Sequence, residues 1–130
     1  MASIQESLSN ITEIDGAVGA AIVDHESAVT LGTIGGEDLD MELAGSGNTR
    51  FILMALEVLD ENGQSETPED VLVTLDRQYH LTRFSAEHDT IFTYLILDRE
   101  EANLALARRQ LAQVEDALDL GELRDDNPLL

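Results

Sequence analysis

Two segments of this chain are apolar at both alternating sets of positions, and they limit its possible folds more than any other feature. Residues 17–24 read AVGAAIVD, and residues 90–97 read TIFTYLIL. A β-strand that is apolar on both sides has to be covered on both faces, which places it in the middle of a sheet. We therefore predict that these two strands pair with each other at the centre of a sheet.

Three other segments complete the predicted sheet. Residues 28–34 contain two threonines, and a short turn joins them to 17–24, which predicts a hairpin with an edge strand. Residues 71–76, 79–85 and 90–97 follow one another with short connections, as in an antiparallel meander. The predicted fold class is α+β: an α/β sandwich with a five-stranded antiparallel sheet in the order 2-1-5-4-3. Two helices cover one face, and one long helix covers the other.

Helical periodicity accounts for most of the remaining chain. Residues 3–13 are predicted to form a short amphipathic helix that starts with a capping box, a serine followed three residues later by a glutamate. Residues 38–62 form the longest helical pattern, and residues 100–118 form a strongly amphipathic one. Acidic residues precede these two helices, so we expect Asp38 and Asp98 to cap them.

The long helix has too many apolar positions for a single contact. At about 100° per residue, these positions divide into two neighbouring stripes. The Phe51 stripe contains Phe51, Met54, Ala55 and Val58. The Ile52 stripe contains Met41, Gly45, Asn48, Ile52, Leu56 and Leu59. We predict that the Phe51 stripe packs on the sheet and that the Ile52 stripe contacts a second helix, with small Gly45 allowing a close approach. A single, deeply buried helix is the alternative.

The charged residues exclude several classes of function. The formal net charge is −20, and all seven basic residues are arginines. Without lysine, the chain has neither the side chain of a Walker-type phosphate loop nor the amine for Schiff-base chemistry. Its negative field repels nucleic-acid backbones and anionic membrane surfaces, so we expect protein partners with neutral or basic faces. Solubility alone also explains the charge.

Length and composition predict one domain. A chain of 130 residues with 43% hydrophobic content is able to bury a single core. We place the domain at residues 1–120 and a flexible acidic tail at residues 121–130. Cysteine is absent, which excludes disulfides and is compatible with a reducing cytosol. We find no signal peptide and no apolar run of about 18 residues, so we expect a cytoplasmic protein.

A glycine pair precedes the long helix, where backbone amides sometimes bind phosphate. Gly35 and Gly36 are followed by three acidic residues within the next four positions, and no lysine supports an anion there. We therefore expect the pair to serve a sharp turn that needs positive φ.

The histidines show no local metal-binding pattern. His25, His80 and His88 fall in a predicted turn, a strand and a loop, without the spacing of zinc sites. Ser85, His88 and Asp89 lie too close together in the chain for a catalytic triad, whose members converge from separate elements. We expect no enzymatic activity, no metal and no cofactor.

Two motifs resemble the roadblock/dynein-light-chain domain. IDGAVGAAIVDHES, residues 14–27, is similar to that family's first turn and hairpin, in which a helix ends at a glycine and a strand finishes in valine-aspartate. EEANLALARRQL, residues 100–111, is similar to its final helix, where an asparagine, alternating leucines and paired arginines recur. The order of the predicted elements over residues 3–118 also matches this profilin-like fold. These motifs support the fold better than any activity.

The resemblance implies a homodimer that serves as a platform for a Ras-like small GTPase. In bacteria, such proteins regulate or scaffold a GTPase of the gliding-motility type, and in actinobacteria they often accompany a sensor-kinase-like protein. The implied dimer joins the long helices and strand 71–76. The predicted interface therefore consists of Met41, Gly45, Asn48, Ile52, Leu56, Leu59, Val71, Val73 and Leu75. A small-ligand sensory domain is the alternative function, although 4% aromatic residues leave little to line a pocket.

One leucine interrupts the polar face of the long helix. Leu53 is flanked on that face by Arg50 and Glu57. A single exposed leucine is ordinary on a protein surface. In a dimer, however, two copies surrounded by polar residues form an apolar anchor with a charged rim. The predicted partner-binding residues are Arg50, Leu53 and Glu57.

Overall fold

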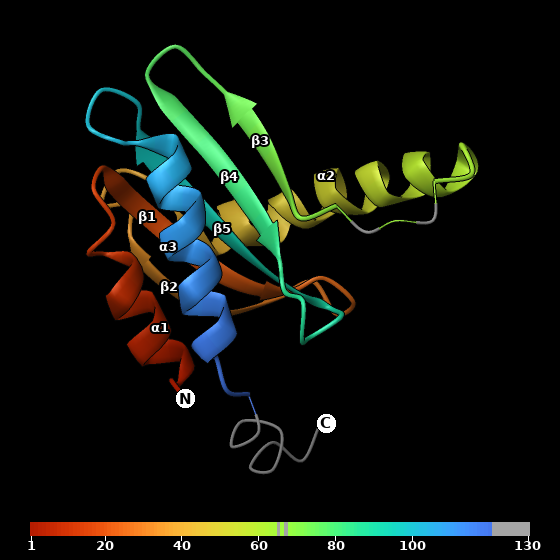
Figure 1. Cartoon of the computed structure of the whole chain (residues 1–130), viewed down its shortest axis with the longest axis horizontal. Coiled ribbons are helices and arrows are strands. Elements are labelled where there is room, and N and C mark those ends of the chain that lie inside the picture. The colour runs from red at the N-terminus through yellow and green to blue at the C-terminus, as the bar shows by residue number, and fades with distance from the viewer. Residues whose placement is uncertain (65, 67, 121–130) are drawn as a thin grey trace.

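A five-stranded antiparallel sheet in the order β2-β1-β5-β4-β3 forms the middle layer of the structure, a computed structural model that describes residues 1–64, 66 and 68–120 (Figure 1). The strands are β1 (Ala17–Asp24), β2 (Val29–Gly35), β3 (Asp70–Thr74), β4 (Gln78–Phe84) and β5 (Ile91–Asp98). The helices are α1 (Ile4–Ile11), α2 (Met41–Glu61) and α3 (Leu104–Ala117). The predicted fold class and strand order are confirmed. The predicted tail, residues 121–130, lies outside the described residues.

The central pair of strands carries both hydrophobic cores, as predicted. β1 and β5 pair through a register that places Ala20 opposite Leu95. Ala20 and Leu95 belong to a core that α1 and α3 cover, whereas Ala21 and Ile96 belong to a second core beneath α2. Each of the two strands therefore contributes buried side chains to both faces of the sheet. No helix in the described part of the chain is long and apolar enough to cross a membrane.

The glycine pair makes the turn that leads from β2 to α2. Gly35 and Gly36 have φ values of 70° and 69°, in the left-handed region that favours glycine. The amide of Gly36 donates to the carbonyl of Val18 at 2.9 Å, so it is not directed at an anion. In the β1–β2 turn, Ala28 has φ 59°, which costs roughly 1–2 kcal/mol for a residue with a β-carbon.

The capping residues differ from the predicted ones at two helices. The Ser3 hydroxyl caps α1 as predicted, accepting from the amide of Glu6 at 3.1 Å. Asp40 rather than Asp38 caps α2, and Asn103 rather than Asp98 caps α3. Asp98 is the last residue of β5. The chain therefore needs a turn before it enters α3, so the helix starts later in the sequence and Asn103 becomes its N-cap.

The predicted orientation of α2 is wrong, because the Ile52 stripe faces the sheet. Met41, Gly45 and Ile52 are buried against the protein's own strands. A β-carbon built on Gly45 lies 3.0 Å from the β-carbon of Ala21, so the close approach that glycine permits is to β1. The amide of Asn48 also points to the sheet, donating to the Thr82 hydroxyl at 2.8 Å. An aspartate at Ile52 would therefore damage the core rather than an interface.

The two glycines of α2 provide a test of this orientation. We expect Gly45→Leu to lower the free energy of unfolding by about 1–3 kcal/mol, because the larger side chain overpacks the contact with β1. Gly47→Leu is the matched control, since nothing lies within 4 Å of a β-carbon built at Gly47. The control should be neutral or stabilising by up to about 1 kcal/mol, the helix-propensity gain. Urea denaturation measures both, and equal effects would contradict this orientation.

Candidate interaction surface

The C-terminal half of α2 extends past the β3 edge and away from the sheet (Figure 1). Because the Ile52 stripe is used by the core, the Phe51 stripe faces solvent. Met54 is 60% exposed and Phe51 is 48% exposed. The exposed large apolar side chains of this helix are Leu43, Phe51, Leu53, Met54 and Val58. An apolar surface of this kind on one projecting helix is typical of a protein interaction site.

The edge strand β3 lies beside this helix and has an unpaired side. β3 pairs only with β4 among the described strands. Val71 is half-buried against the α2-side core, whereas Val73 and Leu75 are exposed. An exposed edge strand with apolar side chains readily pairs with another strand. Of the predicted interface residues, Val73 and Leu75 are thus on an accessible surface, together with an edge that is open for pairing.

The predicted partner-binding residues are all on the surface of α2. Arg50 and Glu57 are exposed, and Leu53 is 44% exposed. Leu53 is not the isolated leucine that the sequence indicated, because Phe51, Met54 and the other members of the exposed set share the same helix. The structure therefore makes Leu53 part of a larger apolar surface.

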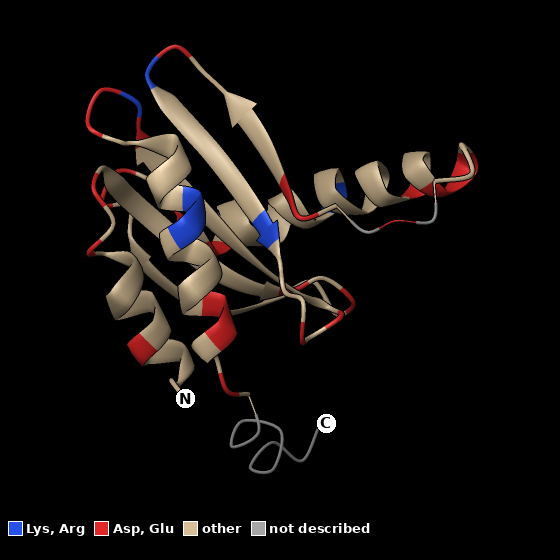
Figure 2. Cartoon of the chain, viewed as in Figure 1, with Lys and Arg blue, Asp and Glu red and all other residues tan. Residues whose placement is uncertain are grey.

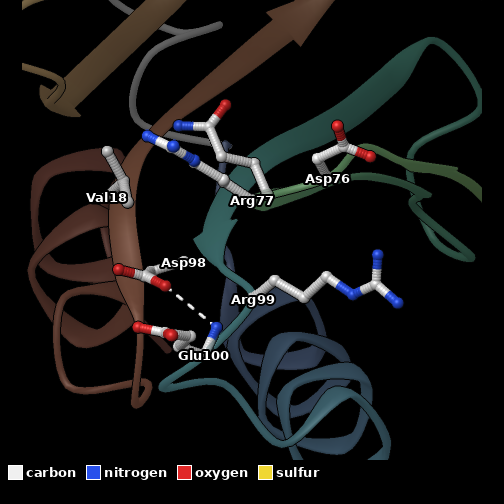
Figure 3. Close-up of a pocket in the computed structure, with 7 residues that line it drawn as sticks. Val18, Asp76, Arg77, Asp98, Arg99 and Glu100 are labelled. Atoms are coloured by element: carbon white, nitrogen blue, oxygen red, sulfur yellow. Dashed lines mark hydrogen bonds between the residues drawn. The ribbon is translucent and has the colours of Figure 1, made fainter.

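A charged pocket of about 770 Å³ lies at the end of the sheet where β4 starts and β5 ends (Figure 3). Its lining residues are Val18, Asp76, Arg77, Gln78, Asp98, Arg99 and Glu100. The Arg99 guanidinium donates to the Leu75 carbonyl at 3.0 Å and lies 5.5 Å from the centre of the Tyr79 ring. The Asp98 carboxylate accepts from the amide of Glu100. Two of the charged groups thus hold the local turns together.

The histidines of the chain occupy separate environments. His80 hydrogen-bonds to Tyr94 at 2.7 Å, and burial lowers the pKa of His80. The His25 ring stacks on the Phe92 ring, with 6.3 Å between the ring centres. His88 donates its backbone amide to the Ser85 hydroxyl. Within the described part of the chain, no group of three potential metal ligands gathers.

A network of charged residues joins α3 to the start of β3. Arg108 makes two hydrogen bonds to the Asp70 carboxylate, at 3.1 and 3.2 Å. Arg83 approaches Asp70 at 3.7 Å and Glu115 at 3.9 Å. Figure 2 shows the basic residues of α3 beside the basic end of β4, in a chain whose charged loop residues are mostly acidic.

Glu115 is a buried titratable residue that was not predicted from the sequence. It is only 6% exposed, and burial raises its pKa to about 8. The nearby Arg83 opposes this rise, whereas Asp116 and Asp70 add to it. The signal in the sequence was its position, four residues after Leu111 and three before Leu118, which places it on the buried face of the helix.

Glu115 should make the stability of the fold pH-dependent. The pKa of Glu115 is higher in the folded chain than in the unfolded chain, so the protonated side chain favours the folded state. This contribution to the free energy of unfolding is complete below about pH 4.5 and is lost as pH rises towards 8. Between pH 5 and pH 9 we expect a loss on the order of 4 kcal/mol at most. Glu115→Gln should remove most of this loss.

Chemical denaturation at a fixed protein concentration measures the effect. Exposed Glu101→Gln is the matched control and should keep the wild-type dependence on pH. A wild-type stability that stays constant from pH 5 to pH 9 would contradict the raised pKa.

Solved structures with the same fold are found among roadblock proteins. A Roadblock/LC7 domain from Streptomyces avermitilis matches with a TM-score of 0.77 at 10% identity, covering 89% of this chain and 94% of that one. Myxococcus xanthus MglB matches with a TM-score of 0.75 at 12% identity, covering 95% and 98%. A structure of MglB with a tetrameric arrangement matches with a TM-score of 0.63 at 13% identity, covering 86% and 87%.

No protein-family model and no curated protein matches the sequence. The structural matches nevertheless extend over most of both chains in every case. The chain therefore has the roadblock/LC7 fold, and the resemblance seen in its sequence is confirmed at the level of the fold.

Proposed function

We propose that this chain, which has the roadblock/LC7 fold, is a non-enzymatic homodimeric regulator or scaffold that binds a Ras-like small GTPase in a bacterial signalling system. The observation that carries the proposal is the projecting half of α2, on which Phe51, Leu53, Met54 and Val58 are exposed, together with the edge strand β3. The sequence resemblance supplies the class of partner. A sensor-kinase-like protein is a further proposed partner, and the proposed location is the cytoplasm.

A second copy of the chain is the proposed occupant of the β3 edge. Two copies related by a two-fold axis pair β3 with β3, and each contributes the same surface to the contact. The sheet then continues across both copies, and the projecting halves of α2 come to lie on the same face of this joint sheet. In this arrangement the Phe51 stripe replaces Met41, Gly45 and Ile52 of the sequence-based interface, while Val73 and Leu75 remain part of it.

A charge on the exposed helix surface should separate the two copies. We expect Met54→Asp to convert a dimer into a folded monomer, because Met54 is outside the core and an aspartate in an apolar contact loses its hydration. Leu106→Asp on α3 is the control, since Leu106 is also an exposed apolar residue, at 38%, and lies on another helix. Sedimentation equilibrium at micromolar concentration measures the mass. A monomeric wild type, or a Met54→Asp variant that stays dimeric, would contradict the proposed interface.

The proposed GTPase contact is on the solvent-facing side of the paired helices. Leu53 supplies an apolar anchor there, and Arg50 and Glu57 supply polar neighbours, a composition that favours a binding hot spot. The net charge of −20 favours a partner with a basic face and predicts an association rate that falls with salt. Any effect on GTP hydrolysis is proposed to require the GTPase itself.

Leu53→Ser tests this contact separately from the dimer. We expect about tenfold weaker binding to a purified Ras-like GTPase of the same organism, loaded with GTP or GDP, because the anchor is lost. The dimer mass and the thermal unfolding temperature should not change. Exposed Glu42→Gln, near the other end of the helix, serves as the control. Unchanged binding together with lower stability would identify Leu53 as a structural residue.

The alternative, a small-ligand sensor, has weaker support. Its candidate site is the pocket shown in Figure 3, whose lining is mostly charged and includes one aliphatic side chain, Val18. Small-molecule sites are usually lined by apolar and aromatic side chains with few polar groups. The lining of this pocket therefore favours the interaction module over the sensor.

A further inference from the structure

The α3 side of the sheet contains a charged cluster that the proposed function does not use. It consists of Asp70 on β3, Arg83 on β4, and Arg108, Glu115 and Asp116 on α3. Among the described residues of α1, none contributes a charge to Glu115. With Glu115 protonated, the cluster contains two cations and two anions and is therefore balanced. Loss of that proton adds one negative charge inside the fold.

Arg83 lies between two carboxyl groups and is fully engaged by neither. Its Nη1 atom is 3.7 Å from Oδ2 of Asp70, and its Nε atom is 3.9 Å from Oε1 of Glu115. Both distances are too long for a good hydrogen bond. Asp70 already receives two hydrogen bonds from Arg108, so it does not depend on Arg83 for a partner. Arg83 is thus free to move towards the carboxyl group whose negative charge is less well compensated.

Glu115 is the carboxyl group whose charge changes with pH. Its Oε1 atom is buried and has no hydrogen-bond partner. A neutral carboxyl group tolerates this position at moderate cost, whereas a buried carboxylate without a partner is strongly unfavourable. A shift of Arg83 by about 1 Å towards Glu115 would bring a donor within normal hydrogen-bond distance.

We propose that Arg83 exchanges partners between Asp70 and Glu115 when Glu115 loses its proton, so that pH sets the ion pairing at the start of the edge strand β3. Asp70 and Arg83 are direct neighbours across the β3–β4 pair. When Glu115 is protonated, Arg83 stays with Asp70 and adds a cross-strand contact at the first residue of β3. When Glu115 is ionised, Arg83 turns to α3, and Asp70 is held by Arg108 alone. The exchange is a property of the single chain and does not depend on the proposed partners.

Nuclear magnetic resonance of the full chain tests the exchange directly. The carboxyl carbon of Glu115 should titrate with a midpoint near pH 8, and the chemical shift of the Arg83 Nε–H group should change with the same midpoint. In Glu115→Gln the Arg83 signal should stay constant over this range. The Arg108 Nε–H signal is the internal control and should move little, because its two bonds to Asp70 persist.

Asp70→Asn provides a second test, which distinguishes a change of partner by Arg83 from a fixed structural role of Arg83. With Asp70 neutral, Arg83 has one carboxyl partner left and no exchange to make, so the change of the Arg83 Nε–H signal across the Glu115 titration should be smaller than in the wild type. The Glu115 midpoint should fall in any case, because the negative charge of Asp70 contributes to its rise. An Arg83 signal that stays constant while Glu115 titrates would overturn the proposal. A Glu115 midpoint near its ordinary value of 4.5 in the wild-type chain would also overturn it, and this result needs no variant to fold.

Discussion

The pairing of β1 with β5 is the contact on which the rest of the structure depends. Both strands contribute to a core above and a core below the sheet. Neither face can therefore be left to solvent, and the chain has to supply helices on both sides. The hairpin with β2 extends the sheet on one side and the meander through β4 and β3 extends it on the other, so β2 and β3 become the edges. The location of the accessible edge at β3 follows from this central pair.

The orientation of α2 converts this architecture into a surface for other molecules. Glycine at position 45 lets the helix approach β1 closely, and Asn48 finds a polar partner on β4. These contacts hold the N-terminal half of the helix on the sheet, while the C-terminal half extends beyond it. The stripe that is left over contains Phe51 and Met54, and it is exposed because the Ile52 stripe of the same helix faces the sheet.

Two of the few cations of this acidic chain balance carboxyl groups at positions that are largely shielded from water. With 27 acidic residues against seven arginines, most carboxylates rely on water. Arg83 and Arg108 are instead placed at the junction of α3 with β3 and β4, where Asp70 and Glu115 are partly or fully buried. Desolvation makes charge balance matter most at such positions. A single proton on Glu115 therefore has consequences that the titration of an exposed glutamate does not have.

The sequence by itself determined the strands, their order and the fold, because a strand that is apolar on both sides is compatible only with the middle of a sheet. It also identified the capping box at Ser3 and the glycine turn at Gly35 and Gly36, which depend on neighbouring residues alone. Only the tertiary structure decided which stripe of α2 faces the sheet. Two adjacent apolar stripes satisfy the same helical periodicity, and the choice rests on contacts of Gly45 and Asn48 with distant strands. The same holds for Glu115, whose raised pKa arises chiefly from its burial in the folded chain, with a smaller contribution from its neighbour Asp116.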